Sequence, residues 1–158
     1  MSRPELGDLK AWARERLIGV QNITFPSFTP DLAELDEEGI RWDVRQAIRH
    51  GFFATLCACE SGLRFDEARR FVEIVADEAG DQLLVGVTLL FDSVEQNRAM
   101  LRHAQEAGCS LVQVALPPNY YPQRSEDVYY ERKSLCDLAE IGVVFLVLYG
   151  FALLICWM

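Results

Sequence analysis

The residues best suited to chemistry in this sequence are thiols and phenols that stand at the ends of short apolar runs. Cys57 and Cys59 are two residues apart at the end of one such run, a spacing that places both thiols on one face of a strand. Metal or redox chemistry is one interpretation. No histidine or acid nearby in the sequence completes a tetrahedral site, so small thiols packed in a core are favoured. We therefore expect no metal and no cofactor.

The tyrosine hydroxyls are candidates for proton transfer. Tyr120 and Tyr121 stand among three prolines, and Tyr149 ends the last apolar run. On residue types alone, packing of a loop explains Tyr120 and Tyr121 as well as catalysis does. The two histidines predict no catalysis, because His50 suits the C-terminal turn of a helix and His103 is expected to be half-exposed on another.

The elements that must position these residues recur about every thirty residues. Glycines stand 28 to 34 residues apart, at positions 19, 51, 80, 108 and 142. Each of the middle three closes an amphipathic stretch, as a left-handed residue at the end of a helix does. Apolar runs follow the last four glycines, at 52–58, 83–87, 111–116 and 143–149.

The amphipathic stretches predict helices. Asp36 is a candidate N-cap ahead of a face formed by Ile40, Val44, Ala47 and Ile48. Ser93 is a second candidate cap. Further predicted features are the apolar face Ala68, Phe71, Val72 and Val75, and a helix that begins at Ser125.

Continuous apolar strands that alternate with helices predict the α/β class, with a parallel sheet covered by helices. Periodicity alone allows an open doubly wound sheet and a barrel equally. In either architecture, ligands bind where the strands end. Those ends carry the turn 57–62, the loop 117–122 and Tyr149.

Length and composition limit the possible domain organisation, binding partners and cellular compartment. The chain has 158 residues, enough for one domain, whereas a closed (β/α)8 barrel takes about 250 residues. A net charge of −9 argues against a nucleic-acid partner. Five cysteines without paired zinc spacing, and a polar N-terminal stretch, predict reduced thiols in the cytoplasm. The apolar stretch 141–158 barely reaches the length of a membrane span, and a buried strand followed by a short apolar tail is favoured over a membrane anchor.

An ordered set of motifs resembles the dihydrodipicolinate synthase / N-acetylneuraminate lyase family. The opening GVQNITFPSFTPDLAELD (19–36) is similar to the family's first strand and TPFT-type loop, and LCACESG (56–62) stands where the family has GTTGE. LPPNYYP (116–122) is similar to its PPYYY turn, and VVFLVLYG (143–150) to its LYNxP strand. The resemblance covers about 130 residues and implies a partial (β/α)8 TIM barrel, with strands 1 to 5 and helices 1 to 4.

The resemblance implies an activity and site residues. The family comprises class I lyases and synthases in which a lysine on the sixth strand forms a Schiff base with pyruvate or another 2-oxo acid. By position, Tyr149 matches the tyrosine that moves protons at the imine, and Tyr120 the tyrosine donated by a neighbouring subunit of a homo-oligomer. Cys57 and Ala58 take the two threonine positions of the motif. Ala58, Cys59 and Glu60 are thereby implied to bind substrate.

The departures bear on activity. Cys57 replaces a hydroxyl with a thiol, a weaker donor, and Ala58 removes a hydrogen bond to the substrate carboxylate. Only two lysines are present, Lys10 ahead of the first strand and Lys133 on the fourth predicted helix, and neither is placed to reach the strand ends. We therefore predict a leader at 1–17, an incomplete barrel at 18–149 and an apolar tail at 150–158 that does not match the family.

Three functions follow from these residues. The first is a lyase of this family that is truncated before its lysine and inactive alone. The second is a non-catalytic binding or oligomerisation module. The third is a protein anchored in a membrane through 141–158.

Overall fold

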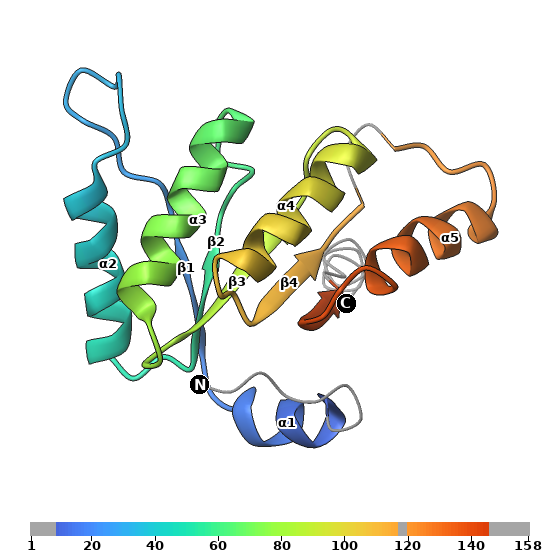
Figure 1. Ribbon diagram of the computed structural model, residues 1–158, viewed down its shortest axis with the longest axis horizontal. Helices are drawn as coiled ribbons and strands as arrows, with labels where there is room; N and C mark the ends of the chain where they lie inside the picture. The colour runs from blue at the N-terminus through green and yellow to red at the C-terminus, as the bar shows by residue number, and fades with distance from the viewer. Residues whose placement is uncertain (1–8, 117–119, 146–158) are drawn as a thin grey trace, which may run out of the picture.

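The fold is a parallel sheet of five strands joined by helices (Figure 1). It is known from a computed structural model, which describes residues 9–116 and 120–145. The strands are β1 (Gln21–Thr24), β2 (Ala54–Cys57), β3 (Leu84–Leu89), β4 (Leu111–Val114) and β5 (Gly142–Phe145). The helices are α1 (Leu9–Arg16), α2 (Glu37–Arg49), α3 (Phe65–Ala79), α4 (Val94–Glu106) and α5 (Ser125–Cys136). The predicted α/β class is confirmed.

The strands lie in sequence order, each parallel to the next. Gln21 is opposite Ala54 in the first pair, and Leu111 is opposite Gly142 in the last. Because consecutive parallel strands need a crossover, a helix returns the chain from the carboxyl end of each strand to the start of the next. All strands therefore end at one edge of the sheet, the upper edge in Figure 1.

The ends of the helices follow the sequence signals. The Asp36 carboxylate accepts the Gly39 N–H at 3.1 Å, and the Ser93 hydroxyl accepts the Gln96 N–H at the same distance. Each of these contacts satisfies a backbone N–H that has no partner inside its helix. Both predicted caps are confirmed.

The glycines that end the helices have left-handed backbone angles. The φ angles are +73° at Gly51, +50° at Gly80 and +90° at Gly108. A side chain strains this conformation, which explains why glycine stands at all three turns.

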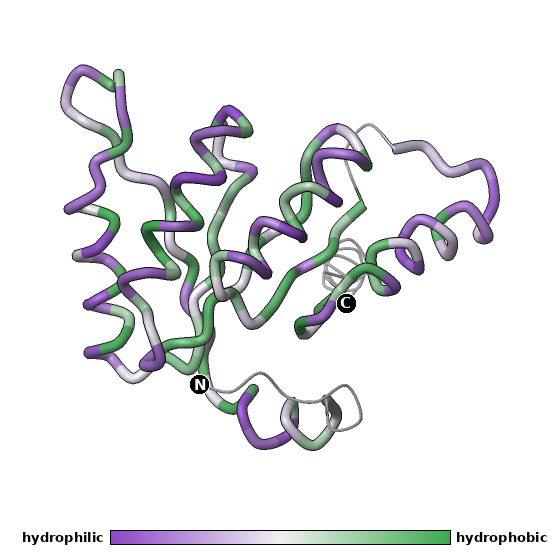
Figure 2. The backbone as a smooth tube through the Cα atoms, in the orientation of Figure 1, coloured by the Kyte–Doolittle hydropathy of each residue, from purple (hydrophilic) through white to green (hydrophobic). Residues whose placement is uncertain are grey.

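One layer of helices, α2 to α5, covers a single face of the sheet (Figure 1). Their apolar sides meet the strands, while polar residues line the side of the helices that faces away from the sheet (Figure 2). Seven of the eight positions predicted for the apolar faces of α2 and α3 are buried, and Ile48 is partly buried; the buried ones are Ile40, Val44, Ala47, Ala68, Phe71, Val72 and Val75. Burial of these side chains is the main stabilising contribution to the layer.

Helix α1 lies at the end where the strands begin, within the predicted leader. Its Trp12, with Leu17, packs against a small cluster formed by Ala54, Leu84 and Leu111, one residue from each of three strands. Part of the segment expected to precede the domain is therefore packed against it.

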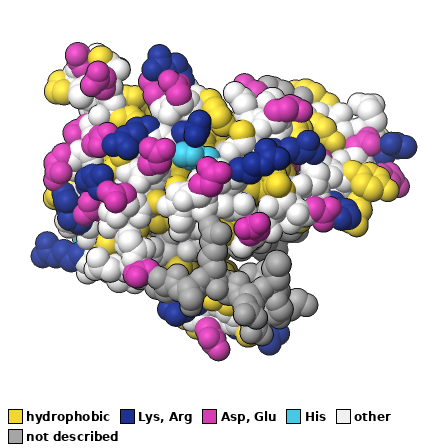
Figure 3. Space-filling view, in the orientation of Figure 1, with side chains coloured by type: hydrophobic (Ala, Val, Ile, Leu, Met, Phe, Trp, Pro, Cys, Tyr) yellow, Lys and Arg dark blue, Asp and Glu magenta, His cyan; other side chains and the backbone are white. Residues whose placement is uncertain are grey.

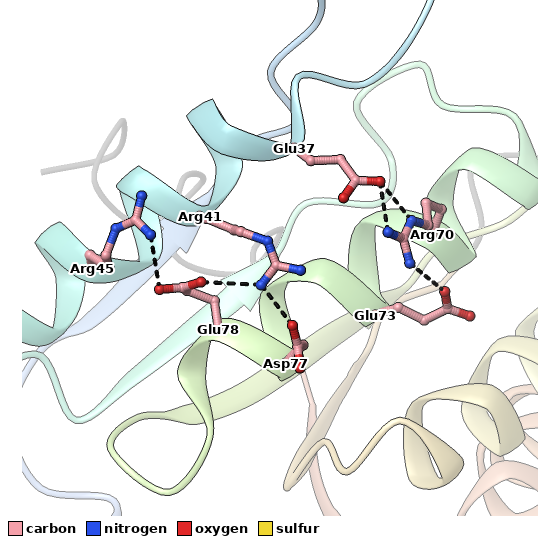
Figure 4. A network of polar contacts seen from close by, with 7 residues as sticks. All are labelled: Glu37, Arg41, Arg45, Arg70, Glu73, Asp77 and Glu78. Carbon is pink, nitrogen blue, oxygen red and sulfur yellow. Dashed lines mark hydrogen bonds and ion pairs between the residues drawn. The ribbon is translucent and has the colours of Figure 1, made fainter.

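Charged side chains of both signs interleave over the outer surface of the helices (Figure 3). Two groups of ion pairs join α2 to α3 (Figure 4). In one, Arg41 reaches Asp77 at 2.7 Å and Glu78 at 3.1 Å. In the other, Arg70 reaches Glu37 at 2.7 Å. Exposed pairs contribute little singly, so the network chiefly orients the two helices against each other.

Truncation of Phe71, the largest fully buried side chain, will measure how much core packing contributes to stability. We expect Phe71→Ala to lower the free energy of unfolding by about 3–5 kcal/mol, because it removes buried surface and leaves a cavity. Urea denaturation followed by circular dichroism measures the change. Trp42→Ala is the control: Trp42 is 56% exposed on α2, and its loss is expected to cost less than about 1 kcal/mol.

Candidate functional site

The turn after β2 brings three of the predicted substrate-binding residues to the carboxyl ends of the strands. Ala58 and Cys59 are buried there, whereas Glu60 is exposed. The Ala58 N–H donates to the Thr24 carbonyl oxygen at 3.1 Å, and the Cys59 N–H donates to the Cys57 carbonyl oxygen at 3.0 Å. Two backbone donors that would serve a substrate carboxylate are thus engaged within the chain.

Cys57 faces the helices, not the interior of the curved sheet. Leu56 contacts Gly86 on the interior face, where a Cβ added to Gly86 would lie 3.2 Å from a Leu56 methyl carbon. Successive residues of a strand point to opposite faces, so Cys57 points to the helical layer. It lies in the same buried cluster as Phe71 and Val87.

Burial determines the state of the thiols. Desolvation raises the pKa of Cys57 well above its usual value, and the nearby Cys59 and Cys109 thiols raise it further. Burial raises the pKa of Cys59 in the same way. Both thiols are therefore protonated at neutral pH, and their environment is that of core packing, as the favoured sequence interpretation holds.

Two threonine hydroxyls pair beside Cys57. Thr24 is its register partner on β1, and the Oγ1 atoms of Thr24 and Thr55 lie 2.7 Å apart in a buried position. Each hydroxyl has its hydrogen-bond partner in the other, which removes the cost of burying them.

A cleft of about 560 Å³ opens between the turn after β2 and the loop after β3. Glu60, Arg64 and Asp92 are the charged residues that line it. Arg64 Nη2 lies 2.9 Å from Glu67 and is mostly exposed. The cleft therefore brings carboxylates and one guanidinium to the strand ends, in open solvent.

The Tyr120 hydroxyl forms a hydrogen bond within its own chain. Its hydroxyl donates to the Asp127 carbonyl oxygen at 3.0 Å, at the start of α5. The neighbouring Tyr121 is 80% exposed. Tyr149, the other predicted catalytic tyrosine, lies outside the described residues.

A buried carboxylate that was not predicted from the sequence belongs to Glu131 of α5, on the side of Arg98 of α4. Glu131 is 9% exposed, and both of its carboxylate oxygens are buried without a hydrogen-bond partner in the described part of the chain. Burial raises the pKa of Glu131, while Arg132 and Arg98 oppose the shift. Glu131 stands four residues before Leu135 on the buried side of α5, a spacing that would have revealed it.

The interior face of the sheet holds two further polar groups that the sequence analysis did not single out. Thr88 and Gln113 are register partners on β3 and β4. The Thr88 Oγ1 and the Gln113 Oε1 are buried, and neither has a hydrogen-bond partner among the described residues. Gln113 is the one polar residue of the apolar run LVQVAL (111–116), and this interruption of the run is the sequence signal that could have identified it.

The two lysines lie on the elements predicted for them, ahead of the first strand and on the helix before the last strand. Lys133 is on α5, where its Nζ pairs with the Asp137 carboxylate at 2.5 Å and the side chain is half-exposed. Asp137 raises the pKa of Lys133. Lys10 belongs to α1, at the opposite end of the sheet from the turn 57–62.

His103 is buried, so the expectation of a half-exposed side chain is wrong. Its Nε2 lies 3.1 Å from the Arg69 carbonyl oxygen, and its Nδ1 accepts the Arg69 Nε–H at 3.3 Å. Glu73 lies 3.5 Å from the same Nε2. Contacts with α3 cover the ring, because α3 and α4 pack closely enough to enclose it.

Within residues 9–116 and 120–145, no group of three histidine, cysteine or acidic side chains is arranged to hold a metal ion. In the same residues, no helix is both long and apolar enough to cross a bilayer. Most of the stretch 141–158 proposed as an anchor lies outside them.

The fold and the position of the turn define a parallel β/α protein of the barrel type. Solved structures share this fold. One of them is an E. coli K12 prophage protein of the dihydrodipicolinic acid synthase family in complex with pyruvate, which matches with a TM-score of 0.73 and 20% sequence identity. The match covers 80% of this chain and 43% of that one. N-acetylneuraminate lyase from Fusobacterium nucleatum gives a TM-score of 0.73 at 16% identity, covering 84% of this chain and 47% of that one. The predicted partial barrel is confirmed.

Sequence comparison gives the same family. Two curated relatives named 4-hydroxy-tetrahydrodipicolinate synthase match, one from Methanopyrus kandleri at 24% identity over 130 residues and one from Chlorobium phaeobacteroides at 26% over 137. They cover 80% and 84% of this chain, which spans 43% and 45% of their length. No family model matches the chain. The predicted resemblance to the N-terminal part of the dihydrodipicolinate synthase / N-acetylneuraminate lyase family is confirmed.

Thiol accessibility will separate the buried cysteines from the partly exposed one. Among the four described cysteines, we expect iodoacetamide to modify Cys136 first, and Cys57, Cys59 and Cys109 on the order of tenfold more slowly, because buried protonated thiols are poor nucleophiles. Peptide mass spectrometry after timed quenching measures the rates. In urea all four rates should converge, and fast labelling of Cys57 in the folded chain would contradict its placement.

Stability as a function of pH will report on Glu131. The folded chain holds the Glu131 proton more tightly than the unfolded chain does, because the folded pKa is raised. The resulting stabilisation is complete below the ordinary pKa of glutamate and is lost as the pH rises through the raised value. Glu131→Gln should therefore raise the free energy of unfolding at pH 7 by about 1 kcal/mol and flatten its acid dependence.

Urea denaturation at pH 4 to 7 measures both effects of Glu131→Gln. Glu15→Gln is the control, since Glu15 is an exposed acid on α1 and its replacement should change little at any pH. A loss of stability in Glu131→Gln at pH 7 would show that the carboxylate has a partner it needs.

Proposed function

We propose that this chain forms the N-terminal part of a carbon–carbon lyase or synthase that acts on pyruvate or another 2-oxo acid through a Schiff base. The observation that carries the proposal is the ordered match: five parallel strands in sequence order, with the turn 57–62 at the carboxyl end of β2. Two relatives named as synthases, and a similar structure that contains pyruvate, support it.

In this proposal, the amine of a lysine attacks the ketone carbon of the 2-oxo acid, and the ketone oxygen leaves as water. The iminium withdraws electrons, so the adjacent carbon loses a proton and forms or breaks a carbon–carbon bond. Tyr149 and Tyr120 are the proposed proton carriers, with Cys57 at the position of the relay hydroxyl. Ala58, Cys59 and Glu60 are the proposed contacts of the turn with the substrate.

The proposal includes inactivity of the chain on its own. Lys133 is tied to Asp137 on an outer helix, and Lys10 belongs to the helix at the other end of the sheet. Neither lysine can form the imine at the strand ends without loss of the fold. The lysine must therefore come from polypeptide outside this sequence.

Assembly and compartment follow from the same proposal. Exposed phenol rings gather near the Tyr120 loop, where Tyr129 and Tyr130 lie 5.4 Å apart, edge to face, and Tyr121 projects into solvent. Aromatic rings are enriched in subunit interfaces, which supports a homo-oligomer whose subunits meet at this loop.

Free thiols at the four described cysteines support a reducing compartment such as the cytoplasm.

A non-catalytic binding module is the second candidate. It is favoured by the turn itself, because the Ala58 N–H is engaged by Thr24 and the Cys57 side chain faces the helical core. Such a turn offers less to a substrate carboxylate than a turn with free hydroxyls does.

Trapping of the imine tests the proposal. The purified chain, incubated with pyruvate and borohydride, should show no mass increase, because it lacks a lysine at the strand ends. The protein purified from its native source under the same conditions should carry a reduced pyruvate adduct on a lysine. An adduct on Lys10 or Lys133 would contradict inactivity, and no adduct in the native material would favour the binding module.

A further inference from the structure

The interior face of the sheet is the face that lies away from α2 to α5 (Figure 1). A Cβ added to Gly86 would lie 3.2 Å from a Leu56 methyl carbon on this face, and Thr88, two residues further along β3, points the same way. Gln113 is the register partner of Thr88, and Val144 is the register partner of Gln113. These three side chains therefore form a row across the interior face.

The centre of the interior face is buried, although no described helix lies over it. Helix α1 reaches the starts of the strands, where Trp12 packs against Leu111. At the two margins, Ile23 on β1 is 50% exposed and Val144 on β5 is 39% exposed. Thr88, between them on β3, is only 2% exposed. The described helices therefore do not account for the burial at the centre.

The atoms buried there include two that lack partners. Thr88 Oγ1 and Gln113 Oε1 are buried, and neither has a hydrogen-bond partner among the described residues. Most buried polar atoms in proteins have a partner, and ordered water or a polar segment would supply one. A segment of apolar side chains instead excludes water and offers neither donor nor acceptor. The cover expected over Thr88 and Gln113 is therefore apolar.

An apolar recess of about 360 Å³ extends this face at the β5 margin. Trp12 and Leu17 of α1, Leu111 of β4 and Val144 of β5 are among the residues that line it. The recess begins beside the strand from which the chain continues to residues 146–158. The surface and the start of that segment are thus adjacent.

The sequence supplies an apolar segment of sufficient length. Residues 150–158, GFALLICWM, carry no charged side chain and lie outside the described residues. Strands are spaced by about 4.8 Å, so the centre of a five-stranded sheet lies about 10 Å from its edge strand and the far edge about 19 Å away. Nine residues span about 14 Å as a helix and about 30 Å when extended. Either form reaches Thr88 and Gln113.

We propose that residues 150–158 fold back over the centre of the interior face of their own chain, with Thr88 and Gln113 beneath them. The segment then protects apolar side chains of the sheet from water, which is the favourable term of the contact. It also occupies the space beside the turn 57–62 on that face, and would keep a 2-oxo acid out of it. Only this last consequence rests on the proposed function.

Alkylation of Cys156 in the full 158-residue chain tests the docking. Iodoacetamide should modify Cys156 on the order of tenfold more slowly in the unchanged chain than in the variant Leu153→Asp/Leu154→Asp, because the two charges oppose burial of the segment. Cys57, which is buried on the helical side, should stay slow in both chains and so report that the variant is folded.

A substitution on the sheet tests the other side of the contact. Val144→Asp should speed alkylation of Cys156 on the order of tenfold by placing a charge at the margin of the interior face. Trp42→Asp is the matched control, because Trp42 is an exposed apolar residue on the outer side of α2. It should leave the rate at Cys156 unchanged.

Thr88→Val tests whether the cover is apolar. Removal of a buried hydroxyl without a partner should raise the urea midpoint of the otherwise unchanged chain. The same substitution in the Leu153→Asp/Leu154→Asp variant should bring no gain, because water then reaches the hydroxyl. This double-mutant cycle measures the coupling between the segment and Thr88 directly.

Three results would overturn the proposal. The first is that Cys156 reacts equally fast in the unchanged chain and in the double variant. The second is that Cys156 is protected only at concentrations where sedimentation shows a dimer, since a second copy would then cover the segment. The third is that protection requires phosphatidylcholine vesicles, since the segment would then enter a membrane. None of them bears on the Schiff-base function, which imine trapping in the native material decides.

Discussion

Parallel pairing of the strands is the constraint on which this structure depends. Parallel neighbours cannot be joined by a tight turn, so each strand needs a helix to return the chain. That requirement places α2 to α5 on one face, directs the apolar sides of the helices inward and brings all strand ends together. The turn at Cys57–Glu60 and the loop at Tyr120 lie at the same edge of the sheet for this reason. The same constraint leaves β1 with one partner among the described strands.

Features that depend on local chemistry were predictable from the sequence. The caps at Asp36 and Ser93 and the left-handed glycines at Gly51, Gly80 and Gly108 each follow from a few adjacent residues. The buried faces of α2 and α3 follow from helical periodicity. The order of the strands followed from the resemblance, since periodicity alone allowed two architectures.

Features that depend on register or on contact between elements were not predictable. The face to which Cys57 points is set by strand pairing, and a shift of one residue would reverse it, so its position in the sequence alone did not predict that face. His103 was expected to be half-exposed, and Arg69 of α3 covers it. The side chains of Glu131, Thr88 and Gln113 have buried oxygen atoms without a hydrogen-bond partner among the described residues. Whether a buried atom has a partner depends on how the elements pack, which a single sequence does not show.

The contact of α1 with the ends of the strands has a consequence for the order of folding. An added Cβ at Gly142 would lie 3.4 Å from the Trp12 ring, so residues near the start of the sequence meet residues about 130 positions later. Trp12 also needs Ala54, Leu84 and Leu111 in place before it has a surface to cover. Contacts of such long sequence separation form late, because the intervening chain must first lose its freedom. Helix α1, which precedes the sheet in the sequence, is thus among the last described elements to pack in place, and its docking reports that the sheet is assembled.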